Sequence, residues 1–323
     1  NRQRSISNTP IKTDGAYPTC PHNLYSIKQF YTQDKMKRRQ FITKGTVGMA
    51  TLGIMAHVPT NVFATTDSKG VNMPIGVQSY VLREEIGKDL TGTLKKMAKM
   101  GYEYVEMCSP TGYMGPFEPL AKYSGAELKK MIADTGMKCN SSHFQFGELK
   151  DNLDERIAFA QQLGLDHMIL AFGLNAATPD ELKENCATLN AIGEKVKKSG
   201  MVVGFHNHAI EFEHKFHDKL VYDILLDELD PELVKMQYQT QPITLGVQGS
   251  DYFNKYPGRF ISAHLQDYSK SDKTKEIAIG QGIADWNDFF AAAQKGGVQV
   301  VYVEMDSNPT GHFEDSIAYL KTL

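Results

Sequence analysis

Histidine and carboxylate side chains recur in this sequence where short apolar runs end. One run ends at His206, with Glu211 shortly after it, and two later runs end at His264 and Glu304. Imidazole nitrogens and carboxylate oxygens suit Mn²⁺, Zn²⁺, Co²⁺ or Mg²⁺. Placed beside a carbonyl, the same groups can also remove and return a proton. These residue types therefore indicate a divalent metal site that assists proton transfer, with Glu211, His264 and Glu304 as its best ligand candidates.

Amide, hydroxyl and further imidazole groups close the other apolar runs. Gln239 ends the run between those of His206 and His264, and its amide oxygen could complete a metal site. Polar groups seldom crowd the ends of apolar strands unless a polar ligand binds there. We expect His206 to be either functional or a hydrogen-bonded core histidine. We expect Glu106 to lie on the opposite half of the fold and to be satisfied internally. Six residues are predicted to contact substrate: Gln78, Tyr80, His143, His206, Asn207 and Gln266.

The elements that must position these groups repeat a simple pattern. Five helix-period segments end at a glycine that a β-branched run follows, as at Gly101 and Gly297, and glycine there supplies the left-handed residue that ends a helix. Strand starts recur every ~32 residues, the size of a strand–helix unit. Eight units predict a single-domain (β/α)₈ TIM barrel over 65–323, with the polar groups at the strands' carboxyl ends. The expected strands are 75–80, 102–107, 138–144, 167–172, 201–206, 234–239, 260–265 and 298–304.

The first sixty-four residues differ from the rest. Arg38 and Arg39 precede a mildly apolar run, and a small-residue cleavage pattern ends at Ala64. This arrangement resembles a twin-arginine export signal, with Met36 as the natural start and cleavage after Ala64. We therefore expect 1–64 to be a leader and the mature protein to be periplasmic, without a stable membrane anchor.

Charge and cysteine content limit the classes of partner that this chain is expected to bind. The formal net charge is −3, but residues 1–64 hold nine Lys/Arg and two Asp/Glu, which leaves 26 and 36 for 65–323, a net of −10. So acidic a body repels nucleic acid. The remaining Cys108, Cys139 and Cys186 have no metal-binding spacing and are expected to be free thiols. A small carbohydrate is the expected partner.

Several motifs together resemble the xylose isomerase-like TIM barrels known as sugar phosphate isomerases/epimerases. The resemblance runs from about residue 74 to the C-terminus and is carried by 76–80 (GVQSY), 204–212 (GFHNHAIEF), 256–260 (YPGRF), 264–267 (HLQD), 279–286 (IGQGIADW) and 303–306 (VEMD). It implies a barrel with a metal held by strands five to eight. Carried over, the ligands are Glu211, Gln239, His264 and Glu304. Gln239 stands where the family usually has Asp, and Gln266 where Lys is common.

The resemblance also implies a reaction. A cation bound by two substrate oxygens polarises a sugar carbonyl, and carboxylates on either face move the adjacent proton. Glu211, Glu304 and His208 are the predicted catalytic residues. The expected activity is a carbohydrate isomerase or epimerase. The alternatives are a 3-keto-glycoside lyase or hydrolase that uses the same enolate, and a non-catalytic carbohydrate-binding barrel that lost its metal. Asp285 before the helix near 286 disfavours a phosphate there, so the sugar is expected to be non-phosphorylated.

Overall fold

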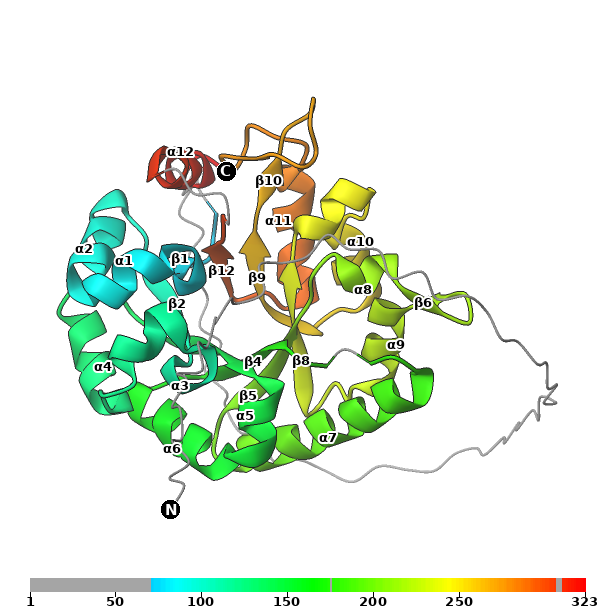
Figure 1. The fold of residues 1–323 in the computed structure, drawn as a ribbon. Helices are drawn as coiled ribbons and strands as arrows, with labels where there is room; N and C mark the ends of the chain where they lie inside the picture. Colours follow the sequence, from blue (N-terminus) through cyan, green and yellow to red (C-terminus); the bar gives the residue numbers. More distant parts are fainter. Residues whose placement is uncertain (1–70, 175, 306–309) are drawn as a thin grey trace, which may run out of the picture. The chain divides into compact units, whose positions relative to one another are not determined.

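The computed structural model describes residues 71–174, 176–305 and 310–323 (Figure 1). The expected leader, with its start at Met36 and its cleavage after Ala64, lies outside these residues. Among the helices that the structure describes, none combines the length and apolarity that crossing a bilayer requires.

Eight parallel strands close into a barrel, in the order β1-β12-β9-β8-β5-β4-β3-β2. The strands are β1 (Ile75–Gln78), β2 (Tyr104–Cys108), β3 (Ser141–Gln145), β4 (His167–Phe172), β5 (Val202–His206), β8 (Val234–Gln239), β9 (Phe260–Leu265) and β12 (Val300–Val303). Apart from the closing pair of β1 and β12, neighbours in the barrel are consecutive along the chain. The predicted (β/α)₈ barrel is therefore confirmed, and the strands 167–172, 234–239 and 260–265 have the expected bounds.

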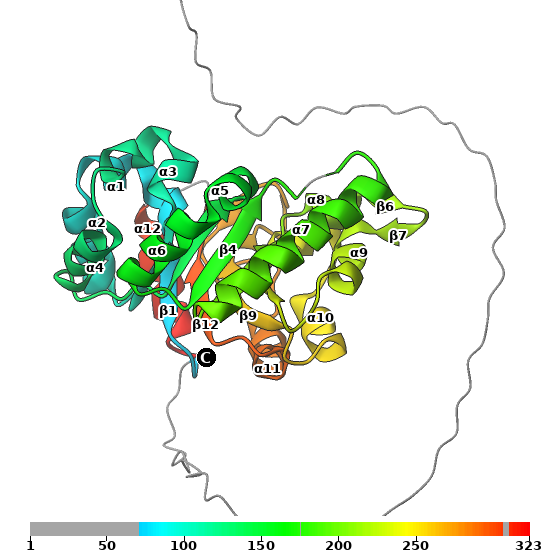
Figure 2. The same cartoon turned by 90° about the horizontal axis from the view of Figure 1, so that it is seen from below.

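A helix follows each strand and covers the outside of the barrel (Figures 1 and 2). The longer helices are α2 (Leu90–Met100), α4 (Gly125–Ala133), α6 (Leu153–Leu163), α7 (Pro179–Lys198), α9 (Val221–Glu228), α10 (Gly249–Lys255), α11 (Trp286–Gly296) and α12 (Thr310–Leu320). Shorter pieces occupy the loops after the strands: η1 (Ser79–Leu82), α1 (Arg83–Lys88), α3 (Pro110–Tyr113), η2 (Gly115–Leu120), α5 (Phe146–Asp151), α8 (Ile210–Glu213) and η3 (Gln241–Leu245). The loops also contain two antiparallel hairpins. One pairs β6 (Lys215–Phe216) with β7 (Lys219–Leu220), and the other pairs β10 (Asp267–Tyr268) with β11 (Glu276–Ile277).

The helix boundaries follow from local chemistry. A capping box starts α4 at Ser124, because the Ser124 hydroxyl accepts from the Glu127 amide and the Glu127 carboxylate accepts from the Ser124 amide. Gly297 ends α11 with φ +98°, and a Cβ there would lie 2.8 Å from the Phe260 carbonyl oxygen. Only glycine therefore fits this close approach of helix end to strand.

Apolar packing on both faces of the sheet holds the strand ends in register. All six residues of β9 are buried, as expected for a parallel strand with helices outside and side chains inside. Trp286 is buried at the start of α11 and belongs to the core. Its indole nitrogen donates to Asp267, whose carboxylate also accepts from the backbone of Gly280, Gly282 and Ala284. Asp267 thus fixes the loop after β9.

Candidate functional site

The polar side chains predicted from the strand ends converge on the barrel axis. In Figure 2 the short helices α3, α5 and α8 lie on the side toward which the arrow of β4 points, the carboxyl end of the strands. This end carries the catalytic groups in TIM barrels. The groups form two layers. We call the deeper layer the inner network: Gln78, Glu106, Ser141, Gln237 and His264. We call the outer layer the mouth group: His208, Glu211, Gln239 and Glu304.

Glu106 on β2 is the centre of the inner network. Its Oε1 accepts hydrogen bonds from Ser141 and, at 2.8 Å, from Gln237 Nε2. Its Oε2 accepts from Gln78 Nε2 at 2.7 Å and from His264 Nε2. Glu106 is thus satisfied internally, as the sequence analysis predicts. One of its partners, His264, lies across the barrel, because interior side chains of a closed barrel meet at the axis.

Electrostatic interactions determine the protonation states of Glu106 and His264 in the inner network. Burial alone would raise the pKa of Glu106, but His143 and His264 hold that pKa well below its usual value. Burial would lower the pKa of His264, but the carboxylates of Glu304 and Glu106 raise it to about 10. His264 Nδ1 lies 2.8 Å from Glu304 Oε2. His264 is therefore an imidazolium at neutral pH, clamped between two carboxylates.

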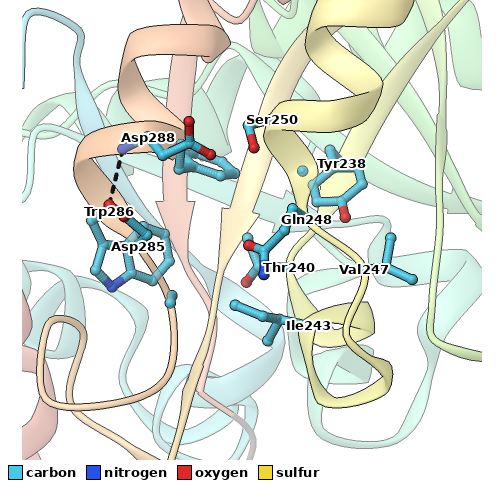
Figure 3. A pocket seen from close by; sticks show the side chains of 12 residues that line it. Tyr238, Thr240, Ile243, Val247, Gln248, Ser250, Asp285, Trp286 and Asp288 are labelled. Carbon is cyan, nitrogen blue, oxygen red and sulfur yellow. Dashed lines mark hydrogen bonds between the residues drawn. The ribbon is translucent and has the colours of Figure 1, made fainter.

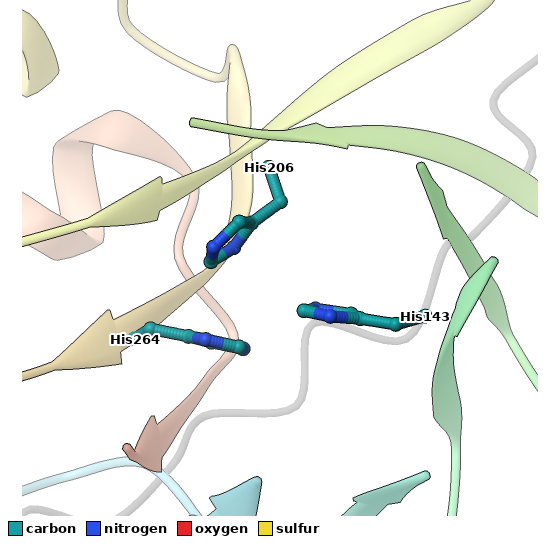
Figure 4. A group of neighbouring side chains, drawn as sticks. All are labelled: His143, His206 and His264. Atoms are coloured by element: carbon teal, nitrogen blue, oxygen red, sulfur yellow. The ribbon is translucent and has the colours of Figure 1, made fainter. Parts of the chain in front are cut away.

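Two further imidazoles, those of His143 and His206, lie beside the His264 ring. A ring nitrogen from each of His143, His206 and His264 lies within 4.8 Å of the others, and the rings face one another in Figure 4. His143 Nε2 and His206 Nδ1 each lie 2.8 Å from Gln237 Oε1, an acceptor, so both nitrogens carry a proton. Desolvation holds the pKa of His206 well below its usual value, so its ring is neutral. His206 is thus both packed in the interior and part of the polar cluster.

Gln239 and Glu304 form the centre of the mouth group. Gln239 Nε2 donates to Glu304 Oε2, the same oxygen that His264 contacts. Gln239 Oε1 is buried and accepts no hydrogen bond from any residue that the structure describes. A buried amide oxygen without a donor is costly. A cation or a substrate hydroxyl would satisfy it.

Glu211 and His208 occupy the loop after β5. Glu211 Oε2 accepts from the His208 backbone amide at 2.7 Å, and no described contact joins it to His264 or Glu304. Desolvation raises the pKa of Glu211 to about 7, against the effect of two backbone hydrogen bonds. Desolvation lowers the pKa of His208 to about 4, so that ring is neutral. Three of the four predicted metal ligands are therefore linked, and Glu211 stands apart as a carboxyl group that titrates near neutrality.

Three of the other residues predicted to contact substrate have side-chain amides that already form hydrogen bonds within the protein. Gln78 lies in the inner network, and its Oε1 accepts from the Tyr80 amide. Asn207 is bound to the backbone of Gln239 through both ends of its amide, which ties β5 to β8. Gln266 Nε2 donates to Glu276, and its Oε1 accepts from Tyr268. The described hydrogen bonds already engage these amides. Their direct contact with substrate stays a prediction.

Tyr80 lies at the edge of the barrel end. Its ring meets Tyr113 edge to face at 6.0 Å, and the guanidinium of Arg83 lies 4.4 Å from its centroid. Gln237 and Ser141 are positioning residues to which the sequence analysis assigns no role. Gln237 precedes Gln239 by two residues on β8, so the alternation of side chains in a strand puts both on the inner face. That spacing is the signal that could have found it.

A separate pocket lies beside the barrel, between β8 and the start of α11 (Figure 3). Tyr238, Thr240, Ile243 and Trp286 are among its lining residues, and none of the predicted site residues lines it. Asp285 caps α11 at its edge by accepting from the Asp288 amide. Two acidic residues at this helix start disfavour an anion there.

Comparison with known proteins places the chain in a family. The model of the xylose isomerase-like TIM barrel family matches residues 94–323, so the chain belongs to that family. No curated protein matches the sequence at a significant level.

Solved structures show the same fold. A sugar phosphate isomerase/epimerase from Parabacteroides distasonis ATCC 8503 is 23% identical, with a TM-score of 0.67, over 82% of this chain and 98% of that one. An L-ribulose 3-epimerase is 15% identical, with a TM-score of 0.58 and coverage of 77% and 94%. The IOLI protein, solved with a bound zinc atom, is 15% identical, with a TM-score of 0.57 and coverage of 77% and 95%.

Proposed function

We propose that this protein is a metal-assisted carbohydrate isomerase or epimerase that moves a proton next to a sugar carbonyl. The observation that carries the proposal is the buried Oε1 of Gln239, which has no partner among the described residues and lies on the side chain that donates to the Glu304 carboxylate. An isomerase or epimerase has to bind the oxygens of a carbonyl and its neighbouring hydroxyl. The amide oxygen of Gln239 can bind a ligand, and the neighbouring ionisable side chains can transfer protons. Together they suit that task.

The donors at the mouth fit a divalent cation. Gln239, His264 and Glu304 would hold it through an amide oxygen, an imidazole and a carboxylate, a set that suits Mn²⁺, Zn²⁺, Co²⁺ or Mg²⁺. His264 would have to lose the proton of one ring nitrogen, and with it one carboxylate hydrogen bond, because only a deprotonated nitrogen can bind a metal. When bound, the cation supplies polarisation of the substrate carbonyl. Structural neighbours solved with zinc and with magnesium support this choice.

Glu211 is the residue that we propose to move the proton. A general base works best when its pKa lies near the working pH, and burial raises the pKa of Glu211 to about 7. The backbone amide of His208 donates to its Oε2 and holds the carboxyl group in place. Glu304, whose pKa His264 lowers against the effect of burial, stays ionised. His208 is neutral and can hydrogen-bond a sugar hydroxyl.

We further propose that the sugar carries no phosphate and that the mature protein acts in the periplasm. TIM barrels often bind phosphate at the loops near strands seven and eight, with a helix N-terminus. Here the N-terminus of α11 is capped by Asp285 and carries Asp288 in its first turn. Both carboxylates repel a phosphate.

Two measurements on the full chain test the proposal. Keto-sugars and glycosides are incubated with Mn²⁺ or Zn²⁺ in D₂O, and we expect solvent deuterium to enter one of them at the carbon beside the carbonyl. Metal analysis of the wild type and of Glu304→Gln is the second measurement, and we expect a bound ion that the variant loses. Metal-free protein that binds sugar without exchange would favour a carbohydrate-binding barrel, the alternative that neutral Gln239 supports.

A further inference from the structure

Phe172, the last residue of β4, presents an aromatic ring at the end of the barrel where the mouth group lies. Its side chain is 44% exposed although the five residues before it in β4 are buried. Its other face stacks on the His208 ring, with centroids 4.7 Å apart and planes at 29°. The exposed ring is therefore continuous with the proposed sugar site.

The backbone holds Phe172 in this position. The pairing of β3 with β4 shifts register between Phe144 and Gln145, so that Gln145 pairs with Phe172 and Ala171 is skipped. Such a bulge redirects the side chain at a strand end and is common next to active sites. Gly173 follows with φ +100°, and a Cβ there would lie 2.8 Å from the Phe146 Cβ. A shifted register and a left-handed turn thus fix the ring from both sides.

Other exposed apolar side chains lie on loops at this end of the barrel. Ile210, 40% exposed, is two residues from His208 at the start of α8. Leu245, 46% exposed, ends η3 after β8 and makes no described aromatic or hydrogen-bond contact with the mouth group. Single exposed apolar residues are common and need no function. Phe172 differs because the ring on which it stacks belongs to the site.

From this continuity we infer that Phe172 forms an apolar subsite for the aglycone of a keto-glycoside, whose sugar ring carries the carbonyl beside which the proton moves, and that an aromatic ring is the best occupant of this subsite. The inference rests on the proposed function, since it places the reacting sugar over the mouth group. A substituent that extends from this sugar past the His208 ring would contact the Phe172 ring, which stacks on His208. Hydroxyls would lose hydrogen bonds to water over the Phe172 and Ile210 side chains, whereas an aryl group would stack on Phe172.

Paired ligands test the inference in the full chain. Phenyl and methyl glycosides of glucose, galactose, mannose and xylose differ within each pair only in the aglycone, and calorimetry measures their binding with Mn²⁺ present. We expect a phenyl glycoside to bind about tenfold more tightly than its methyl partner. In Phe172→Ala this preference should fall to about twofold or less, and in Phe172→Tyr it should persist. Leu245→Ala, an equally exposed apolar truncation, should leave it unchanged.

Two results would overturn the inference. If no phenyl glycoside binds more tightly than its methyl partner, the subsite does not exist. If Phe172→Ala weakens both members of a pair equally, the ring contacts the sugar and not the aglycone. Failure of the proposed function is distinguishable: a phenyl preference that depends on Phe172, without deuterium exchange into any sugar, leaves the subsite and removes the catalysis. Deuterium exchange without a phenyl preference would support the catalysis and remove the subsite.

Discussion

The inner network and the mouth group use the same residue types but differ in how fully their atoms are paired. Both Glu106 oxygens accept two hydrogen bonds each, and the residue is entirely buried. Two residues beyond Gln237 along the same strand, the Oε1 of Gln239 has no partner in the part of the chain that the structure describes. Burial raises the pKa of the Glu211 carboxyl group to about 7. A saturated network positions side chains and resists change, while an unsaturated one invites a ligand. The comparison separates the supporting layer from the reacting layer.

The largest expected effect falls on the inner network. Glu106→Ala removes four hydrogen bonds and leaves the buried His264 with one carboxylate, so we expect a loss of about 3–5 kcal/mol in the free energy of unfolding. Glu304→Ala, at the mouth where water can replace the carboxylate, should cost clearly less. Urea denaturation at pH 7 measures both. Equal losses would mean that the two layers do not differ in this way.

A smaller effect depends on pH and concerns Glu211. Its pKa is raised from the usual 4.5 to about 7 in the folded state, so folding favours the protonated form. The stability that this gives is complete below pH 4.5 and is lost as the pH rises through 7, by up to about 3 kcal/mol. Glu211→Gln lacks this loss. Urea midpoints of the two proteins should therefore diverge between pH 5 and 8, with the variant more stable at pH 8, and parallel curves would contradict the assignment.

The smallest effect sharpens the comparison at Gln239. Gln239→Asp places a carboxylate beside Glu304, so without metal we expect a melting temperature about 2–4 °C lower than in Gln239→Asn, which has the same side-chain length and no charge. Mn²⁺ should stabilise the Asp variant more than the Asn variant, because a cation relieves the repulsion between two carboxylates. An equal response of the two variants to Mn²⁺ would argue against a cation at this position.

Much of the fold could be predicted from the sequence because its signals are local. Glycines such as Gly101 and Gly297 end helices, and the β-branched runs after them begin strands within two or three residues of the observed bounds. The placement of polar groups at the strand ends follows from the barrel itself. That is why His143, His206, His264 and Glu304 could be expected to lie near one another.

The partners of these groups could not be predicted, because they depend on side-chain directions across the barrel. Nothing in the sequence shows that Glu106 reaches His264 on a strand 158 residues away. Glu211 follows β5 closely, yet in the α8 turn its carboxylate accepts from the His208 amide and makes no described contact with Glu304. The exposed direction of Phe172 depends on a register shift that no local pattern encodes.

Proton transfer by Glu211 is tested by deuterium incorporation from D₂O into a non-phosphorylated keto-sugar, followed by NMR with Mn²⁺ and compared between the wild type and Glu211→Gln. We expect incorporation beside the carbonyl in the wild type and a rate at least about a hundredfold lower in the folded variant. Equal rates in the two proteins, or no incorporation into any sugar by metal-loaded wild type, would contradict it.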